Sequence, residues 1–366
     1  MRIGILTFHR AHNFGAFLQA FALKTFLVER GHEVEFVDYW PKEHAALYKY
    51  FHSEDVKSVK SFLRECLVAY YRRRKAKPFL KAHADVLKLD RTPRYTKHQE
   101  LLSVEYDIII YGSDQIWWKS RLKGVDGFDP AYWGMYVPAS VRRVVYAASM
   151  GAIELNPCEK QTVKQLLKGF EFISVREIQL KEEIKSLTEK NIEVNIDPTL
   201  LLDKDFWAKF CTHIPESRYI LYYRMMADKE ADISVKLLSD QTGLPIVELG
   251  ATISTYRHLS KYTKSASPFD FISLIRNAEY VVSTSFHGVA FSIIFEKQFY
   301  AIGMGNRSNR VQSLLSALGI EYCLIECKEK MLIEERIDYV KVKDKLKVLQ
   351  QQAENYLMRT THERTN

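Results

Sequence analysis

The chain has 366 residues, of which 47% are hydrophobic and 27% are charged, and its formal net charge is +8. This composition is that of an ordinary globular protein and excludes a predominantly disordered or collagen-like chain. Because single hydrophobic cores stop growing at about 250–300 residues, the length favours two domains.

The sequence predicts a cytosolic protein. The apolar run at the start, Arg2–Phe8, is too short for the core of a signal peptide, and no uncharged stretch approaches the roughly 20 residues that span a bilayer. Five scattered cysteines argue against a disulfide framework. Cys323 and Cys327 have no second pair at zinc-site spacing, so we expect no metal ion and no other cofactor.

Apolar runs of strand length alternate with helical patterns along the first half of the chain. This alternation is typical of βαβ units. The first run ends in a polar turn, His9–Gly15, and apolar residues then recur at helical spacing as far as Gly31. We predict strands at Arg2–Phe8, Glu33–Val37, Tyr106–Tyr111, Arg143–Ala148 and Phe170–Val175.

A basic segment, residues 57–81, lies between the second and third of these strands. It contains Arg72–Lys75 and Lys77, and apolar residues recur every three or four positions from Val59 to Tyr70. The pattern predicts a basic amphipathic helix. We expect its apolar stripe to pack on its own domain, and peripheral docking on the inner face of an anionic membrane is the alternative. Nucleic acid is not expected as a partner, because no recognised binding motif accompanies the charge.

The second half repeats this architecture after Asp197 and Pro198, where the proline interrupts regular structure. The predicted strands are Arg218–Tyr223, Pro245–Leu249, Glu279–Ser283 and Gln298–Ile302, and the predicted helices are Lys204–Phe210, Asp270–Asn277 and Glu334–Leu357. The sequence therefore predicts an α/β fold of two Rossmann-like domains, residues 1–200 and 201–330. Residues 331–366 would form a C-terminal helix that crosses back to the first domain.

Ligands of open α/β sheets bind beyond the carboxyl ends of the strands, so polar segments at those ends are candidate sites. The first segment, His9–Gly15, leads into a helix whose free N–H groups suit an anionic or hydroxyl-rich ligand. Asn13 and Gly15 are its candidate binding residues. The alternative is a capped turn in which both residues adopt unusual backbone angles.

The second segment is Gly112–Trp118. It places the polar side chains of Ser113, Asp114 and Gln115 beside Trp117 at the end of a strand. An indole can stack on a sugar ring while polar side chains bond the sugar hydroxyls. The alternative is that Asp114 caps a helix and that the tryptophans fill the core.

The third segment, Ser283–Gly288, follows another apolar strand. It offers the hydroxyls of Ser283 and Ser285, the imidazole of His287 and a glycine at the start of a helix. This combination indicates a phosphate or carboxylate site with a general acid or base beside it.

In order and spacing, these motifs resemble those of the polysaccharide pyruvyl transferase family. The resemblance spans roughly residues 2 to 325 and rests on Asn13–Ala20, Tyr106–Trp117, Ser174–Glu177, Asp197–Thr199 and Ser285–Gly288. It implies a fold like that of GT-B glycosyltransferases, in which two Rossmann-like domains face each other across a cleft. Phosphoenolpyruvate would bind mainly to the C-terminal domain and the acceptor saccharide mainly to the N-terminal domain.

The resemblance also implies the reaction. A pyruvyl group would pass from phosphoenolpyruvate to two hydroxyls of one sugar, in a surface polysaccharide or its lipid-linked precursor, as a cyclic ketal with release of phosphate and without a metal ion. His287 matches the histidine of the family's Arg-Leu-His-Gly motif and is the candidate proton donor. Asp114 is the candidate catalytic residue for the acceptor hydroxyls.

The chain departs from that motif at Ser285, where the family has arginine. Another cation must then bind the anionic donor, and arginine suits this role because its guanidinium bonds phosphate and carboxylate bidentately. Arg224 follows a predicted strand at the place of a donor-binding arginine of the family, while Arg307 and Arg310 lie in the loop after another strand. For Arg307 we favour a surface role.

Two other functions stay open. One is a GT-B glycosyltransferase that uses a nucleotide sugar, for which paired glutamates separated by seven residues would be a sign. Glu321 and Glu329, and also Glu326 and Glu334, fit that spacing, but overlapping matches in a glutamate-rich stretch are most simply explained by chance. The other is a non-catalytic glycan-binding relative, which the serine at position 285 suggests.

Overall fold

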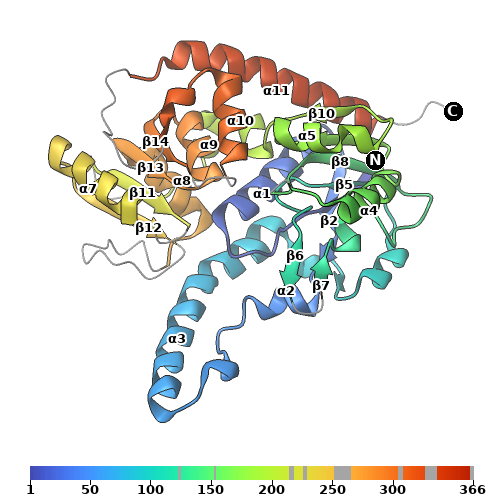
Figure 1. Ribbon diagram of the computed structural model, residues 1–366, viewed down its shortest axis with the longest axis horizontal. Coiled ribbons are helices and arrows are strands. Elements are labelled where there is room, and N and C mark those ends of the chain that lie inside the picture. The colour runs from blue at the N-terminus through green and yellow to red at the C-terminus, as the bar shows by residue number, and fades with distance from the viewer. Residues whose placement is uncertain are drawn as a thin grey trace.

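The computed structural model contains two β-sheets with helices packed against them (Figure 1). The structure describes residues 1–122, 125–151, 154–213, 218–225, 229–250, 265–303, 308–325 and 336–362. The first sheet has six strands in the order β10-β9-β8-β5-β1-β2, and the second has five in the order β12-β11-β13-β14-β15. Every pair of neighbours in both sheets is parallel, which confirms the predicted α/β fold with two Rossmann-like sheets.

The first sheet is built from residues before position 195. Its strands are β1 (Arg2–Leu6), β2 (Glu33–Phe36), β5 (Ile108–Tyr111), β8 (Arg142–Ala148), β9 (Phe172–Val175) and β10 (Ile192–Val194). The helices in this part are α1 (Phe14–Val28), α2 (Lys42–Ala46), α3 (Val59–Ala82), α4 (Pro157–Leu167) and α5 (Ile178–Ile184). Two small sheets pair β3 (Asp38–Tyr39) with β4 (Arg94–Tyr95) and β6 (Ser120–Leu122) with β7 (Val125–Gly127). The residues of β5 are completely buried, as expected for a central parallel strand covered on both faces.

The second sheet is built from residues after position 219. Its strands are β11 (Ile220–Arg224), β12 (Ile246–Gly250), β13 (Tyr280–Ser283), β14 (Gln298–Ile302) and β15 (Leu324–Ile325). The helices are α6 (Lys204–Ala208), α7 (Lys229–Thr242), α8 (Pro268–Asn277), α9 (Phe286–Ile294), α10 (Asn309–Leu318) and α11 (Tyr339–Thr361). Short helical turns occur at Ser53–Asp55, His83–Leu87, Leu89–Arg91, His98–Ser103, Pro130–Trp133, Lys185–Leu187, Pro198–Leu201 and Glu321–Cys323.

Side chains from both sheets form one continuous hydrophobic core at the junction between them. On α1, Phe14 stacks on Phe271 of α8, with ring centroids 4.9 Å apart and planes 3° from parallel. Helix α11 lies along both halves of the molecule (Figure 1). Near its C-terminal end the Tyr356 hydroxyl donates to the carbonyl of Val145 on β8 at 2.7 Å, and near its start the Tyr339 hydroxyl donates to the carbonyl of Lys297. Helix α11 therefore bonds to the part of the chain that builds each sheet.

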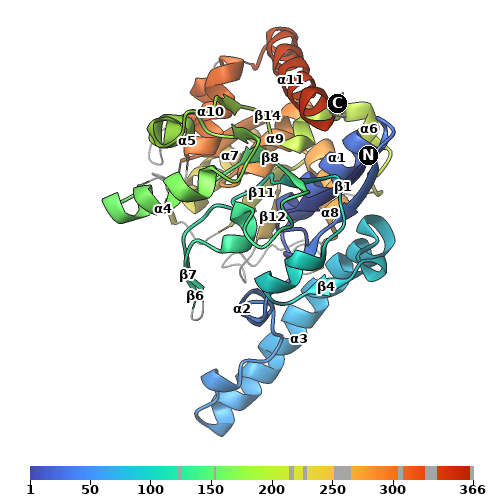
Figure 2. The same ribbon diagram turned by 90° about the vertical axis from the view of Figure 1, so that its right-hand side faces the viewer.

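Helix α3 forms where the basic segment predicted a helix, but its packing differs from the prediction. It extends away from the two sheets in both views (Figures 1 and 2). Apolar residues along its first half are exposed, whereas Ala76, Phe79 and Ala82 near its end are buried. The expectation that its apolar stripe packs on its own domain is therefore wrong for the first half of the helix. Within the described residues, no helix is long and apolar enough to cross a membrane.

Candidate active site

The loop from β13 to α9 carries His287 at the junction of the two sheets. The Ser283 hydroxyl acts within the turn, because the Ser285 amide donates to Oγ of Ser283 at 3.0 Å and Ser283 Oγ donates to the Ser285 carbonyl at 3.2 Å. The following Gly288 has no room for a side chain, since a Cβ there would lie 2.1 Å from Ser283 Oγ. This tight turn buries His287 in the first turn of α9.

The first turn of α1 packs directly against the His287 ring. A Cβ atom on Gly15 would lie 1.9 Å from Nδ1 of His287, so glycine is required there by close approach and not by an unusual backbone angle. Asn13 is extended and caps α1, its Oδ1 accepting from the Ala16 amide at 3.2 Å. The alternative of unusual backbone angles at both residues is therefore wrong, and a role for Asn13 in substrate binding stays a prediction.

Three charged residues from the carboxyl ends of the first sheet form a chain of contacts that starts at His287. Asp197, which follows β10, has Oδ2 3.4 Å from Nε2 of His287. Arg176, which follows β9, donates from Nη1 to the same Asp197 oxygen, and its Nη2 lies 3.6 Å from Oδ1 of Asp114 after β5. Asp197 also accepts from the backbone amide and the hydroxyl of Thr199, at 3.0 and 2.7 Å. The site is thus formed by loops of one sheet meeting a helix of the other.

Asp197 is the fixed negative charge of this cluster. Burial by itself raises the pKa of its carboxyl group, but the nearby His287 and Arg176 and the Thr199 amide lower it well below the ordinary range. Burial raises the pKa of the neighbouring Glu177, whose carboxyl group accepts a hydrogen bond from Ser149. Asp197 is therefore ionised at neutral pH and balances positive charge on the groups it contacts.

Several buried nitrogen atoms in the cluster are unsatisfied. Among the described residues, Nε and Nη2 of Arg176 and Nε2 of His287 are buried without a hydrogen-bond partner. Nε2 of His287 lies 3.4 Å from Asp197, and Nη2 of Arg176 lies 3.6 Å from Asp114. Both are contacts with a carboxylate, but neither is a hydrogen bond. Buried polar groups almost always have partners, so these nitrogens can accommodate a ligand that supplies acceptor atoms.

Arg310, in the first turn of α10, joins the same cluster. Its guanidinium carbon is 5.9 Å from the ring centre of Phe286, and that of Arg176 is 4.7 Å from the same ring. Burial and the charge of Arg176 lower the pKa of Arg310, while Glu177 and Asp114 act in the opposite direction. Two guanidinium groups therefore lie beside Phe286, the residue between Ser285 and His287. They provide positive charge next to position 285, where this chain has a serine in place of an arginine.

Arg224 lies at the end of β11 in different surroundings. Its Nε donates to Oε1 of Glu248 at 2.7 Å, and both side chains are almost completely buried. Within the described part of the chain, its two Nη atoms are buried without a hydrogen-bond partner. Arg307 lies outside the described residues. A role for either arginine in donor binding stays a prediction.

The segment after β5 contributes less to the site than predicted. Trp117 is fully buried, stacks on Trp133 at 4.3 Å and donates from Nε1 to the Tyr132 carbonyl at 3.1 Å. Ser113 is also fully buried and donates to the Ala147 carbonyl at 2.7 Å. A sugar-binding role for these two residues is therefore wrong, because neither is accessible. Gln115 is partly buried, and a Cβ on Gly151 would lie 2.6 Å from its Nε2.

Asp114 differs from Ser113 and Trp117 because it is partly exposed, and it faces Arg176. No helix follows it, so it does not cap one. Burial and the charge of Asp114 raise the pKa of Tyr48 to about 12, which puts these two side chains within electrostatic reach. Asp114 therefore belongs to the His287 cluster through Arg176 and also acts on Tyr48 by its charge.

Tyr48 lines a cavity of about 560 Å³ beside the N-terminal end of α1. The cavity is both aromatic and basic, and its lining includes Arg10, His12, Trp40, Tyr48 and His83. Burial and the charge of Lys75 lower the pKa of His12 to about 4, so His12 is neutral at pH 7. Aromatic rings beside hydrogen-bonding groups are suited to a sugar.

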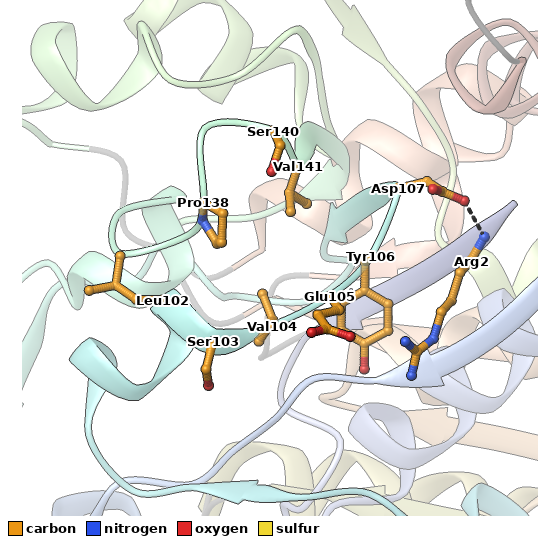
Figure 3. A pocket seen from close by; sticks show the side chains of 10 residues that line it. All are labelled: Arg2, Leu102, Ser103, Val104, Glu105, Tyr106, Asp107, Pro138, Ser140 and Val141. Carbon is orange, nitrogen blue, oxygen red and sulfur yellow. Dashed lines mark hydrogen bonds between the residues drawn. The ribbon is translucent and has the colours of Figure 1, made fainter.

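A second cavity, of about 530 Å³, lies at the opposite edge of the first sheet. Figure 3 shows Arg2, Tyr106 and Asp107 among its lining residues, with the Arg2 amide donating to Asp107 at 2.6 Å. These residues begin β1 or precede β5, and Val141 precedes β8. This cavity therefore lies at the amino ends of the strands, whereas α/β proteins bind ligands at the carboxyl ends.

The sequence did not predict roles for Arg176 and Asp197. Both residues belong to motifs on which the family resemblance rests, and both follow the end of a strand. That position is the feature of the sequence from which a role in the site could have been predicted. Asp197 was interpreted only as part of a break between domains. Its contact with His287 depends on the second sheet and cannot be inferred from local sequence. Among the described residues, no three His, Cys, Asp or Glu side chains gather where they could hold a metal ion.

Comparison with solved structures shows the likeness in fold. A Listeria monocytogenes protein named as a UDP-N-acetylglucosamine 2-epimerase aligns with a TM-score of 0.52 and 13% identity, over 98% of this chain and 95% of the other. The Methanocaldococcus jannaschii UDP-GlcNAc 2-epimerase has a TM-score of 0.47 and 11% identity, over 96% and 93% of the two chains. An E. coli heptosyltransferase has a TM-score of 0.41 and 9% identity, over 95% and 100%.

Comparison of the sequence gives the family. No curated protein matches the chain. The family model described as polysaccharide pyruvyl transferase matches residues 13–306, which include the α1 start, Asp114, Arg176, Asp197 and His287. The chain therefore belongs to the polysaccharide pyruvyl transferase family.

Proposed function

We propose that this protein transfers a pyruvyl group from phosphoenolpyruvate to two hydroxyls of a sugar, in a surface polysaccharide or its lipid-linked precursor. The observation that carries the proposal is the group of buried, unsatisfied nitrogens on Arg176 and His287, next to Arg310. A small anion with phosphate and carboxylate groups would provide the missing acceptors. Family membership supports the same reaction class.

In this proposal His287 donates a proton to C3 of phosphoenolpyruvate. The C2=C3 electron pair takes up that proton, and a sugar hydroxyl oxygen bonds to C2 while its own proton passes to a base. The second hydroxyl oxygen then bonds to C2 and gives up its proton to the departing phosphate, as the bond from C2 to the phosphate oxygen breaks. The products are a cyclic ketal and inorganic phosphate, and a positioned acid and fixed cations would lower both barriers.

The charged residues of the site have separate roles in this proposal. Asp197 would hold the His287 ring and balance its charge when the ring is protonated. Arg176 and Arg310 would bind the donor in place of the arginine that Ser285 replaces, and Arg224 is a further proposed donor ligand. Asp114, which is partly exposed and faces Arg176, would bind the acceptor hydroxyls.

A thermal-shift titration tests the choice of donor. Because a ligand stabilises the native state by mass action, phosphoenolpyruvate at about 100 times its Kd should add about 2.7 kcal/mol, and UDP-N-acetylglucosamine should add nothing. Arg310→Gln should weaken the response to phosphoenolpyruvate. Stabilisation by the nucleotide sugar alone would instead support a glycosyltransferase, and a response to neither would favour a non-catalytic relative.

A further inference from the structure

The first half of α3 exposes a continuous apolar face. Val59, Phe62, Leu63, Cys66, Leu67 and Tyr70 recur at the three- and four-residue spacing of one helix face, and all six are exposed. Val59 is 79% exposed, Leu63 63% and Tyr70 59%. We call these six residues the apolar face of α3. Among the described residues Phe51 packs edge-on against Phe62, yet all six side chains stay exposed, and exposed apolar patches of this kind mark interaction surfaces.

The same helix carries the excess charge of the chain. Residues 57–81 contain nine Lys and Arg and one Glu, which gives +8, the net charge of the whole protein. The rest of the chain therefore has equal numbers of basic and acidic residues. The single acidic residue, Glu65, forms an ion pair with Arg72 of the same helix. Seven of the basic side chains are exposed: Lys57, Lys60, Arg64, Arg73, Arg74, Lys77 and Lys81.

We propose that α3 docks the protein on an anionic lipid bilayer, with its apolar face among the acyl chains at the interface and its basic side chains on the headgroups. An amphipathic helix with a basic polar part binds in this manner, through apolar burial and attraction to anionic lipid together. A second copy of the same surface would bring together two segments of residues 57–81, each of charge +8, so the charge favours a lipid partner over self-association. Nucleic acid would use the charge but would leave the apolar face uncovered.

Docking through α3 would also bring the aromatic cavity near the membrane. Leu80 of α3 lines that cavity, as does His83, which follows the helix. A helix of 24 residues is about 36 Å long, so the cavity would lie within that distance of the bilayer. This fits a lipid-linked saccharide acceptor, a consequence that rests on the proposed function, whereas membrane docking itself does not.

Vesicle co-sedimentation of the full chain, without donor or acceptor, tests the docking. The protein should bind phosphatidylcholine vesicles that contain about one third phosphatidylglycerol at least tenfold more tightly than pure phosphatidylcholine vesicles. Leu63→Ser with Leu67→Ser should weaken binding at least tenfold. The matched control is Ile233→Ser with Leu237→Ser on α7, a pair at the same spacing that is 61% and 48% exposed, and it should leave binding unchanged.

A charge variant separates the two contributions. Arg73→Gln with Arg74→Gln should reduce binding to the anionic vesicles and its salt sensitivity, whereas Lys345→Gln with Lys347→Gln, at exposed positions on α11, should not. All these side chains are exposed, so each variant should keep the wild-type circular dichroism spectrum and melting temperature.

Three results would overturn the proposal. The first is equal binding to neutral and anionic vesicles, or binding to neither. The second is a loss of binding in the charge variant but not in the leucine variant, which would indicate a site for another polyanion. The third is a dimer in light scattering that Leu63→Ser with Leu67→Ser converts to a monomer, which would indicate a second copy as the partner. None of these results depends on pyruvyl transfer.

Discussion

Gly15 and His287 meet across the junction of the two sheets, and a Cβ atom at residue 15 would lie 1.9 Å from Nδ1 of the histidine. The first turn of α1 therefore forms one wall of the space in which the imidazole is held. Because the ring also contacts Asp197, a side chain of α9 is held between two segments of the first half of the chain, the start of α1 and the loop after β10.

Gly15→Ala should displace the His287 ring from Asp197. Overpacking of a close contact costs about 1–3 kcal/mol of stability, and misplacement of the proton donor should reduce kcat by about 100-fold. Gly169→Ala is the matched control, since a Cβ there has no neighbour closer than 3.6 Å. Full activity of Gly15→Ala in a phosphate-release assay would show that the ring position is not critical.

His287→Gln should fold normally and lose most of its turnover. The amide can keep a polar contact with Asp197 but cannot donate a proton as an acid does, and general acid catalysis contributes roughly 10²–10⁴-fold. His287→Ala should show a similar loss. The measurement is kcat with phosphoenolpyruvate held at saturation, with circular dichroism as the check on folding. Wild-type turnover in either variant would remove His287 from the mechanism.

Asp197→Asn should destabilise the protein by about 3–5 kcal/mol at pH 7, because Arg176 would lose its buried counter-charge. The pKa of Asp197 is depressed in the folded state, so its contribution to stability is present above the ordinary aspartate pKa of about 3.9 and is lost as the pH falls toward the folded value. The difference between wild type and variant should therefore be constant from pH 7 to about pH 5 and shrink below about pH 4. Urea denaturation at several pH values measures it, and a difference that grows on acidification would contradict this assignment.

Arg310→Gln and Arg224→Gln should have different effects. Loss of Arg310 should raise the KM for phosphoenolpyruvate by about tenfold or more with little change in stability, since it removes a charge-assisted donor bond. Loss of Arg224 should lower stability, because it removes the buried ion pair with Glu248, and should raise the donor KM by less than the loss of Arg310.

Arg310→Lys, which keeps the charge, should recover part of the affinity but not all of it, since lysine lacks the bidentate fork. Initial rates at varied donor concentration and thermal unfolding separate the two arginines. If only Arg224→Gln raised the KM for phosphoenolpyruvate, the donor would bind at the end of β11 and not at Arg310.

Much of the fold could be predicted from the sequence because parallel strands are long apolar runs. Strands such as β5 and β13 lie within two residues of their predicted positions. The short strands β10 and β15 were not predicted, since three and two residues give no periodic signal. The exposed apolar face of α3 was also not predicted, because an amphipathic pattern shows that a face needs covering but not what covers it.

The site was predictable only where its chemistry is local. His287 stands in a turn whose polar residues are close in sequence, so the pattern identified it. The pairing of Arg176 with Asp197, and of Asp197 with His287, joins three separate loops and requires the tertiary fold. Trp117 gave a misleading signal, because an indole beside polar residues is as suitable for a core as for a sugar site.

Mass spectrometry of the surface glycan tests pyruvyl transfer most directly. The glycan from cells with the gene should carry a pyruvyl ketal that is absent when the gene is deleted, that returns with the wild-type gene and that does not return with His287→Gln. An unchanged ketal in the deletion strain, or its full restoration by His287→Gln, would contradict the account.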